Sequence, residues 1–369
     1  MTEPTRPRPA TRPPARLVAV GFQGFGNVGD EAILCGLERL LDGVATLDVI
    51  VAGTVAPVVA ARTSRRIHPW KLLPTPAALR LIRRADAVVI SGGGLVNDYW
   101  PLVIPRYLAW VVAARLMGRP VVWAGVGVGP VRRRPWRLLA GIAFALSNAV
   151  VVRDRASETA AARLLPAARV RVAADPAFAL RGPADRPAGS GVGVIVRSPA
   201  PGDERHLGRL VAALAGTITG LVGRGVKVDV LTMHPAEDRA IRTALQAALA
   251  GGIGAGVEIT ALPDDPNAAA TALASYAALV STRLHGIILG AVVGVPSVAI
   301  VYDPKVGAVA ELLGLADVAI PLAEVTSDTI DAALAAIADR SRIADLATRL
   351  DIQRDRLNVI RDAIVEVVA

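Results

Sequence analysis

The feature that most constrains the fold is the regular alternation of short β-branched segments with longer segments of helical periodicity. In the first half of the chain, strands are expected at 17–21, 46–51, 87–91, 121–125, 149–152 and 170–173. Helices are expected between them, for example at 31–41, 102–117 and 154–165. Strands that alternate with helices pair in parallel through crossover connections. The sequence therefore predicts a doubly wound α/β sheet.

The alternation is interrupted once and then restarts. Residues 181–190 are rich in Pro and Gly, lack periodicity and are interpreted as a linker. Beyond them, strands are expected at 191–197, 226–232, 257–260, 278–281 and 297–302, with helices at 206–222, 236–250, 327–338 and 343–368. A chain of 369 residues is too long for one ordinary core. We therefore predict two Rossmann-like domains, 16–180 and 191–369, facing a cleft, with the closing helices in the second domain.

The formal charge of +9 raises the question of an anionic partner. Part of this charge, Arg6, Arg8, Arg12 and Arg16, lies in a proline-rich opening segment, and residues 1–15 are expected to form a disordered tail. No zinc-finger spacing or aromatic RNA-binding pattern accompanies the arginines, so nucleic acid is not expected as a partner. Two interpretations stay open: a solvated basic surface with a tail, or peripheral contact with anionic lipid head groups or a phosphorylated, lipid-linked substrate.

Cysteine and histidine usage limits the chemistry. Cys35 is the single cysteine, and the four histidines are scattered without the spacing of metal ligands. We therefore expect neither an internal disulfide nor a metal site. The basic, proline-rich start does not resemble a signal peptide, and the longest apolar stretch, 107–131, is interrupted by Arg115, Arg119 and Pro120. A cytoplasmic protein is the prediction.

Ligands of open α/β sheets bind beyond the carboxyl ends of the strands, and the first strand ends in a glycine-rich turn. Gly24, Gly26 and Gly29 match the spacing of a dinucleotide-binding turn. The second strand, however, ends at 49–53 without the acidic residue that would hold a ribose, and Asp30 would repel a pyrophosphate. Nicotinamide binding is therefore disfavoured. Asp30 either caps its helix or faces the cleft as a base.

Two further strand ends of the first half carry candidate anion-binding features. Gly92, Gly93 and Gly94 follow the strand at 87–91, where three glycines let the backbone approach a ligand and leave its N–H groups free. Arg153 follows the strand at 149–152. Its guanidinium is suited to clamp a carboxylate or phosphate, and an ion pair between structural elements is the equally open alternative.

In the second half, cationic side chains follow two neighbouring strands. Arg283 and His285 come after the strand at 278–281, and Lys305 comes after the strand at 297–302. A single His is more often structural and a single Arg or Lys is usually solvated. Three such groups at adjacent strand ends, facing the same cleft, favour a functional site.

These segments together resemble the polysaccharide pyruvyl transferase family. The matching motifs are GFGNVGDEAIL (24–34), SGGGLVND (91–98), GVGVGP (125–130), VVRDRAS (151–157), ADPAF (174–178), STRLHG (281–286) and GVPSVAIVYDPKV (294–306). They occur in the family's order over almost the whole folded chain. The resemblance implies two Rossmann-like domains arranged as in a GT-B glycosyltransferase. This sequence departs from the family's pattern at residues 94–98, where relatives often carry Ser and Gln. The departure affects the identity of the acceptor more than the reaction.

The resemblance also implies a reaction and its residues. Phosphoenolpyruvate would be the donor and a sugar of a cell-wall or exopolysaccharide glycan, free or lipid-linked, the acceptor, with formation of a pyruvate ketal and no cofactor or metal. His285, Asp30 and Arg283 are the predicted catalytic residues. The predicted substrate-binding residues are Lys305, Arg153, Gly92, Gly93, Gly94 and Asn27. The alternatives are a GT-B glycosyltransferase that uses a nucleotide sugar and a non-catalytic binding protein of a glycan pathway.

Overall fold

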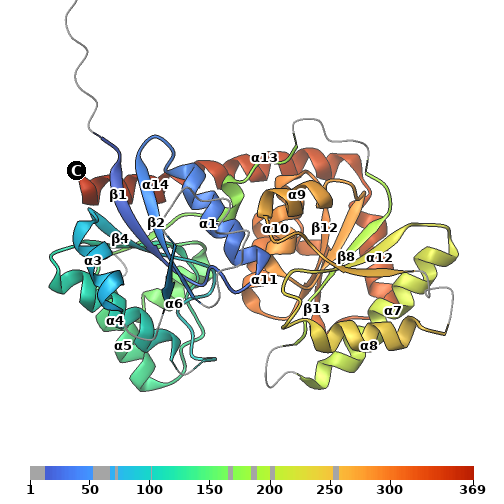
Figure 1. The fold of residues 1–369 in the computed structure, drawn as a ribbon. Coiled ribbons are helices and arrows are strands. Elements are labelled where there is room, and N and C mark those ends of the chain that lie inside the picture. Colours follow the sequence, from blue (N-terminus) through green and yellow to red (C-terminus); the bar gives the residue numbers. More distant parts are fainter. Residues whose placement is uncertain are drawn as a thin grey trace, which may run out of the picture.

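The computed structural model describes residues 13–52, 67–70, 74–100, 102–164, 169–183, 189–199, 204–251 and 257–369. Within these residues the chain forms two parallel sheets that lie side by side (Figure 1). The first sheet has seven strands in the order β3-β2-β1-β4-β5-β6-β7, and the second has six in the order β10-β9-β8-β11-β12-β13. Both contain the doubly wound order 3-2-1-4-5-6, so the predicted pair of Rossmann-like sheets is confirmed.

The elements of the first sheet are short strands linked by helical crossovers. Its strands are β1 (Ala15–Val20), β2 (Ala45–Ala52), β3 (Ile67–Trp70), β4 (Ala87–Ser91), β5 (Val121–Val126), β6 (Ala149–Val152) and β7 (Val170–Val172). Its helices are α1 (Val28–Leu40), α3 (Pro76–Arg84), α4 (Val103–Leu116), α5 (Arg134–Ala145) and α6 (Arg155–Ala161). A 3₁₀ turn, η2 (Pro176–Ala179), leads out of β7 towards the second sheet.

The second sheet repeats this plan. Its strands are β8 (Val192–Val196), β9 (Val228–Thr232), β10 (Glu258–Ala261), β11 (Ala278–Ser281), β12 (Ser297–Val301) and β13 (Ala319–Pro321). Its helices are α7 (Leu207–Gly223), α8 (Arg239–Leu249), α9 (Pro266–Leu273), α10 (Leu284–Val292), α11 (Pro304–Leu312) and α12 (Ser327–Ile337). The chain closes with α13 (Arg340–Arg356) and α14 (Asn358–Val368).

Two apolar cores hold the layers together. One core joins one face of the first sheet to α3, α4 and α5 and is filled by Trp110, Trp123 and Phe144. The other core extends from α1, on the opposite face of that sheet, through the second sheet and its helices. Because α1 packs against α9 and α10, the two sheets share one continuous apolar interior. This contact fixes the carboxyl edges of both sheets relative to each other.

The closing segment differs from the sequence prediction. It was expected to form one helix at 343–368, whereas the structure has two, which meet at Leu357. The last helix, α14, packs on β5 and β6 of the first sheet, and Ile360 lies against the backbone of Gly125. The chain therefore returns to the first sheet after it has built the second. The division into domains at 181–190 stays a prediction, and residues 184–188 of that linker lie outside the described residues.

The opening segment also needs a correction. Ala15, the last residue of the predicted tail, and Arg16, placed in the unfolded opening segment, both lie in β1, and the Arg16 backbone N–H donates to Asp86 Oδ2 at 2.7 Å. The remainder of the predicted tail up to residue 12 lies outside the described residues. β3 was missed because a four-residue strand that contains Pro69 shows no alternating pattern. In the described part of the chain, no helix combines the length and the apolar composition needed to cross a bilayer.

Candidate active site

The glycine-rich turn after β1 positions Asp30 at the start of α1. Asn27 caps this helix by accepting a hydrogen bond from Gly29 N, and its amide donates to Asp30 Oδ2 at 2.8 Å. Asp30 is therefore not the cap, and its carboxylate faces the space between the sheets. Burial raises the pKa of Asp30 above its usual range, although the nearby His285 opposes this shift. A carboxylate with a raised pKa is a stronger base than an exposed one.

The same turn has no room for a pyrophosphate. The backbone N–H of Gly24 donates to Glu31 Oε1 at 2.6 Å, and the Glu31 side chain is buried. A carboxylate of the protein thus occupies the place that a dinucleotide phosphate would take in a Rossmann turn. This agrees with the sequence interpretation that disfavours nicotinamide binding.

The glycines after β4 have different roles. Gly92 has a φ of +153° and its backbone lies against Leu95, so it shapes the turn. The Gly93 N–H faces the Asp30 carboxylate, so it is not free for an anion as predicted. Gly94 has open space around its Cα. Only the second and third glycines of this turn, among the described residues, line the cavity described below.

Arg283 and His285 lie at the beginning of α10, directly after β11. Arg283 is the N-terminal boundary residue of the helix and His285 lies in its first turn. The His285 ring packs against the backbone of α1, because a Cβ on Gly29 would lie 2.3 Å from His285 Nδ1. A Cβ on Gly93 would lie 3.8 Å from the Cε1 atom of the same ring. A side chain of the second sheet thus touches both glycine turns of the first.

A buried ion network supports His285 from behind. Its Nε2 lies 3.6 Å from Asp175 Oδ2, and the same oxygen accepts from Arg153 Nη1 at 3.1 Å. Arg153 also donates to Asp154 Oδ2 at 3.1 Å. Burial raises the pKa of Asp175, but His285 and Arg153 outweigh it and hold this pKa below its usual range. Asp175 therefore stays ionised and lies close enough to His285 to orient its ring.

This network decides between the two interpretations of Arg153. Its guanidinium is 3% exposed and is paired with two carboxylates, so the ion pair between structural elements is present. It also reaches the wall of the cavity, close to the Gly127 backbone. The positive charge of Arg153 is thus largely balanced within the protein.

Arg283 is held by a carboxylate on the segment before α8. One of its terminal nitrogens donates to the fully buried Asp238, and Glu237 Oε2 lies 3.7 Å from that nitrogen. Asp238 is itself fixed by the backbone N–H of His234 at 3.1 Å. The Arg283 Nε atom is buried and has no hydrogen-bond partner. The network orients the guanidinium in the wall of the cavity described below.

Two cations, one after β8 and one after β12, lie around the Tyr302 ring. The Arg197 guanidinium, which follows β8, lies 4.5 Å from the centroid of the Tyr302 ring. Lys305 Nζ lies 5.8 Å from the same centroid and 3.3 Å from Asp303 Oδ2. Asp303 also accepts from the Tyr99 hydroxyl at 3.4 Å, which links the first sheet to the second across the opening.

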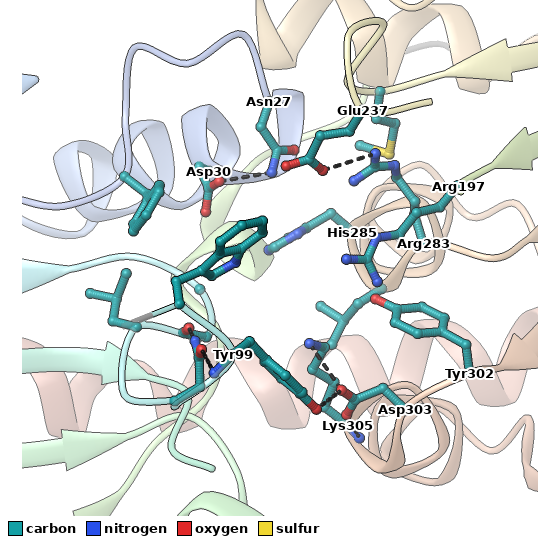
Figure 2. A pocket seen from close by; sticks show the side chains of 18 of the residues that line it. Asn27, Asp30, Tyr99, Arg197, Glu237, Arg283, His285, Tyr302, Asp303 and Lys305 are labelled. Atoms are coloured by element: carbon teal, nitrogen blue, oxygen red, sulfur yellow. Dashed lines mark hydrogen bonds and ion pairs between the residues drawn. The ribbon is translucent and has the colours of Figure 1, made fainter. Parts of the chain in front are cut away.

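These side chains enclose one cavity of about 230 Å³ at the carboxyl edges of both sheets, called the main cavity here. Figure 2 shows Asn27 and Asp30 on one side, Arg197, Arg283 and Lys305 on the other, and His285 between them. The predicted site residues found in its walls are Asn27, Asp30, Gly93, Gly94, Arg153, Arg283, His285 and Lys305. Gly92 is the predicted residue that does not line it.

A second cavity of about 260 Å³ adjoins the main cavity. Its walls include the glycine turn after β5, the first residues of α6, and Arg132. It shares Tyr99 and Lys305 with the main cavity. The two spaces together provide room for a ligand larger than the donor alone.

Several residues of the site were not predicted. Asp175 and Arg197 follow β7 and β8, so the strand-end rule that found Arg153 could have found them. Asp238 carries no such signal, because it lies before a helix rather than after a strand. In the described part of the chain, no group of three or more His, Cys, Asp or Glu side chains is arranged to hold a metal ion.

Solved structures share the architecture over nearly the full length. The putative UDP-N-acetylglucosamine 2-epimerase of Listeria monocytogenes gives a TM-score of 0.60 at 12% identity, covering 90% of this chain and 91% of that one. MurG of Acinetobacter baumannii gives 0.50 at 14% identity, covering 95% and 100%. At these identities the likeness concerns the fold alone, and the GT-B-like arrangement is confirmed.

Sequence comparison identifies the family. The amylovoran biosynthesis protein AmsJ of Erwinia amylovora is 24% identical over 405 residues, which cover 93% of this chain and 96% of that protein. Residues 27–304, which include every predicted site residue except Lys305, match the model of the polysaccharide pyruvyl transferases. The resemblance seen in the motifs is thereby confirmed, and the chain belongs to the polysaccharide pyruvyl transferase family.

Proposed function

We propose that the protein transfers the pyruvyl group of phosphoenolpyruvate to two hydroxyls of a sugar in a cell-wall or exopolysaccharide glycan, with formation of a pyruvate ketal and release of phosphate. The observation that carries this proposal is the arrangement of the main cavity. Arg197, Arg283 and Lys305 line one wall, and Asp30 lines the other. Membership of the family supports the pyruvyl transfer and the polysaccharide acceptor.

The cationic wall suits a donor with two anionic groups. Phosphoenolpyruvate carries a carboxylate and a phosphate, and guanidinium groups bind both with paired, charge-assisted hydrogen bonds. Arg283 has an unpartnered Nε, and Arg197 pairs with no carboxylate among the described residues. The same charges would stabilise the phosphate as it departs.

The proton balance of the reaction requires both an acid and a base. A proton adds to the methylene carbon of the donor, and one sugar hydroxyl attacks the adjacent carbon. The second hydroxyl then displaces phosphate and closes the ketal. Of the two protons that the hydroxyls lose, one replaces the proton given to the methyl group and the other leaves with phosphate. Acid and base residues whose protonation states are restored after each turnover are therefore sufficient for this reaction.

His285 is the group proposed to protonate the methylene carbon. Its Nε2 lies 3.6 Å from the buried Asp175, whose pKa is held below its usual range against the effect of burial. A fixed carboxylate behind the ring keeps the ring oriented for proton transfer. The ring also contacts Gly29 and Gly93, so a change in its tilt would require the glycine turns to move.

Asp30 is the proposed base towards a sugar hydroxyl. Asn27 holds one carboxylate oxygen at 2.8 Å, and burial raises the pKa of Asp30. The carboxylate is close to the His285 ring, since both contact the space above Gly93. The acid and the base thus both border the main cavity.

The aromatic rim of the main cavity is the proposed acceptor platform. Trp100 is 56% exposed and Tyr99 is 47% exposed, and both line the cavity. Large aromatic side chains that are exposed beside a cavity indicate a surface that binds a ligand. Sugar rings stack on such faces while their hydroxyls point to polar groups, which are available here at Asp30 and Asn27.

The experiment that tests this function is product analysis in deuterated water. The protein is incubated with phosphoenolpyruvate and a set of bacterial glycans or their lipid-linked precursors. We expect phosphate release that depends on both substrates, and an acceptor that gains a carboxyethylidene group with one deuterium in its methyl group.

Two results would contradict the proposal. Transfer of a sugar from a nucleotide donor, with no product from phosphoenolpyruvate, would assign the protein to the glycosyltransferases. Anion binding without any product on the full acceptor set would favour a binding protein. A His285→Gln sample serves as the control for phosphate released without enzymatic transfer.

A further inference from the structure

The helices on the outer face of the first sheet carry most of the net positive charge of the chain. Residues 76–148 contain ten arginines and two aspartates, without lysine or glutamate, whereas the whole chain has a formal charge of +9. This segment contains α3, α4 and α5, which lie together on one side of the sheet (Figure 1). The charge is therefore concentrated on one region of the surface.

The two aspartates of this segment do not neutralise the arginines. Asp86 accepts from the backbone N–H of Arg16, and Asp98 accepts from the backbone N–H groups of Arg132 and Arg133 at 2.6 and 2.9 Å. Among the described residues, no carboxylate forms an ion pair with the exposed side chains that follow: Arg115, Arg132, Arg133, Arg134 and Arg137. These cations are available for an external partner.

Exposed apolar side chains lie among these arginines. Leu138 and Ile142 on α5, and Leu146 directly after it, follow the spacing i, i+4, i+8 and are 65%, 39% and 38% exposed. They form a stripe on the solvent side of the helix, while Ala140, Ala143 and Phe144 face the sheet.

The neighbouring helix extends this stripe. Val112 and Leu116 on α4 are 36% and 83% exposed. The two helices pack against each other, and Arg115 Nη1 donates to Asn148 Oδ1 at 3.1 Å, so the end of α4 lies beside the end of α5. We call the exposed arginines and apolar side chains of these two helices, with Arg132 and Arg133, the α4–α5 face.

We propose that the α4–α5 face docks on a membrane that contains anionic lipids. Guanidinium groups would bind the lipid phosphates, and the leucine and isoleucine side chains would enter the boundary of the acyl chains. This combination is typical of helices that lie in the plane of a membrane surface.

Two other occupants fit the face less well. A nucleic acid would use the arginines but would leave the exposed leucines in contact with water or phosphate. A second copy of this chain, related by a two-fold axis, would place the same unpaired arginines opposite each other. A lipid surface satisfies both the charge and the apolar stripe.

The position of the face gives the docking a consequence for the site. Arg132, just before α5, also lines the second cavity. Docking would bring the opening of that cavity near the membrane, where an acceptor glycan attached to a lipid carrier would be presented. This consequence rests on the proposed function, whereas the docking itself does not.

Co-sedimentation of the full chain with vesicles tests the proposal. The vesicles contain phosphatidylcholine alone or a mixture with phosphatidylglycerol. We expect the wild type to sediment with the anionic vesicles and not with the neutral ones. Arg134→Gln combined with Arg137→Gln should weaken binding about fivefold per arginine, which corresponds to about 1 kcal/mol each, and added salt should reduce the difference. Leu138→Gln combined with Ile142→Gln should weaken it at least as much at every salt concentration.

Matched controls are Ile352→Gln on α13 and Arg361→Gln on α14, which remove comparable exposed side chains away from the α4–α5 face. Both should bind as the wild type does. The proposal is overturned if the wild type ignores anionic vesicles, or if the α5 variants bind as the controls do.

Two further measurements identify the competing occupants. A dimer in the ultracentrifuge that becomes monomeric in the Leu138→Gln, Ile142→Gln variant would make the face an interface between copies. Binding of a nucleic-acid duplex that depends on Arg134 and Arg137, without vesicle binding, would assign it to nucleic acid. Either result overturns the proposal. An unchanged melting temperature, expected for these exposed substitutions, confirms that the variants are folded.

Discussion

The two walls of the main cavity differ in charge and in origin. The wall from the first sheet offers Asp30, Asn27 and the Gly93 backbone, together with Arg153, whose charge is balanced by Asp154 and Asp175. The wall from the second sheet offers Arg197, Arg283 and Lys305, with Glu237 beside Arg283 and Asp303 beside Lys305. This segregation indicates a division of work, in which the second wall holds an anionic donor and the first removes a proton from the acceptor.

His285 is the residue at which the two walls meet, and its substitution should have the largest effect. It belongs to α10 of the second sheet but contacts Gly29 and Gly93 of the first. His285→Gln should lower the single-turnover rate about 10²–10⁴-fold while donor affinity stays close to that of the wild type. His206→Gln, in the segment before α7, is the control and should leave the rate unchanged.

The alternative role for His285 is structural. A variant with a lower melting temperature, and with donor binding and turnover impaired together, would show that the imidazole only supports the turn. A stable variant with nearly normal turnover would remove His285 from the mechanism.

The second prediction tests the role of the wall from the first sheet. Asp30→Asn keeps the shape of the side chain and removes the base, so turnover should fall about 10²-fold or more. Affinity for phosphoenolpyruvate should not fall, because the substitution removes a negative charge from an anion-binding cavity. Titration of the donor into the variant, together with the turnover rate, checks both parts. A marked loss of donor affinity would mean that the two walls do not divide the work as described.

The third prediction tests the role of the wall from the second sheet. Arg197→Gln and Lys305→Ala should each weaken phosphoenolpyruvate binding about tenfold, the effect of one lost charge-assisted contact. The loss should be larger for Arg197, because Lys305 is already paired with Asp303 at 3.3 Å. Arg283→Ala is a poorer test, since it would leave the buried Asp238 unpaired and destabilise the fold by about 3–5 kcal/mol. If the variants of both walls lost turnover and donor affinity to the same extent, the proposed division of roles between the walls would be contradicted.

The smallest expected effect concerns stability. Burial raises the pKa of Asp30 in the folded protein, so its charged form costs stability at every pH above that pKa. Below the unfolded pKa the residue is protonated in both states and the penalty disappears. Asp30→Asn should therefore raise the melting temperature slightly near neutral pH, and the gain should shrink as the pH falls towards 4. A gain that grows on acidification would show that the carboxylate stabilises the fold.

Much of the site could be predicted because the strand-end rule is geometric. Once β11 and β12 were recognised, Arg283, His285 and Lys305 had to lie on one edge. The rule cannot reveal how charges are balanced. Arg153 was a candidate clamp, but Asp154 and Asp175 compensate it, and only the three-dimensional structure brings Asp175 to it.

The fold was predictable for a similar reason, and the deviations have local causes. The alternation of strands and helices defined the two sheets. The break at Leu357 was not visible, because the helical periodicity continues through it and only packing of Ile360 on β5 reveals where α14 belongs. The tail was expected to extend to residue 15 because of the prolines before it, although β1 begins at Ala15.

The most direct test of the central claim is calorimetric titration of phosphoenolpyruvate into the wild type, Asp30→Asn and Arg197→Gln, with UDP-N-acetylglucosamine as the comparison ligand. The two-wall account predicts saturable donor binding to the wild type and to Asp30→Asn, about tenfold weaker binding to Arg197→Gln, and no binding of the nucleotide sugar. Saturable binding of the nucleotide sugar, with none of phosphoenolpyruvate, would contradict it.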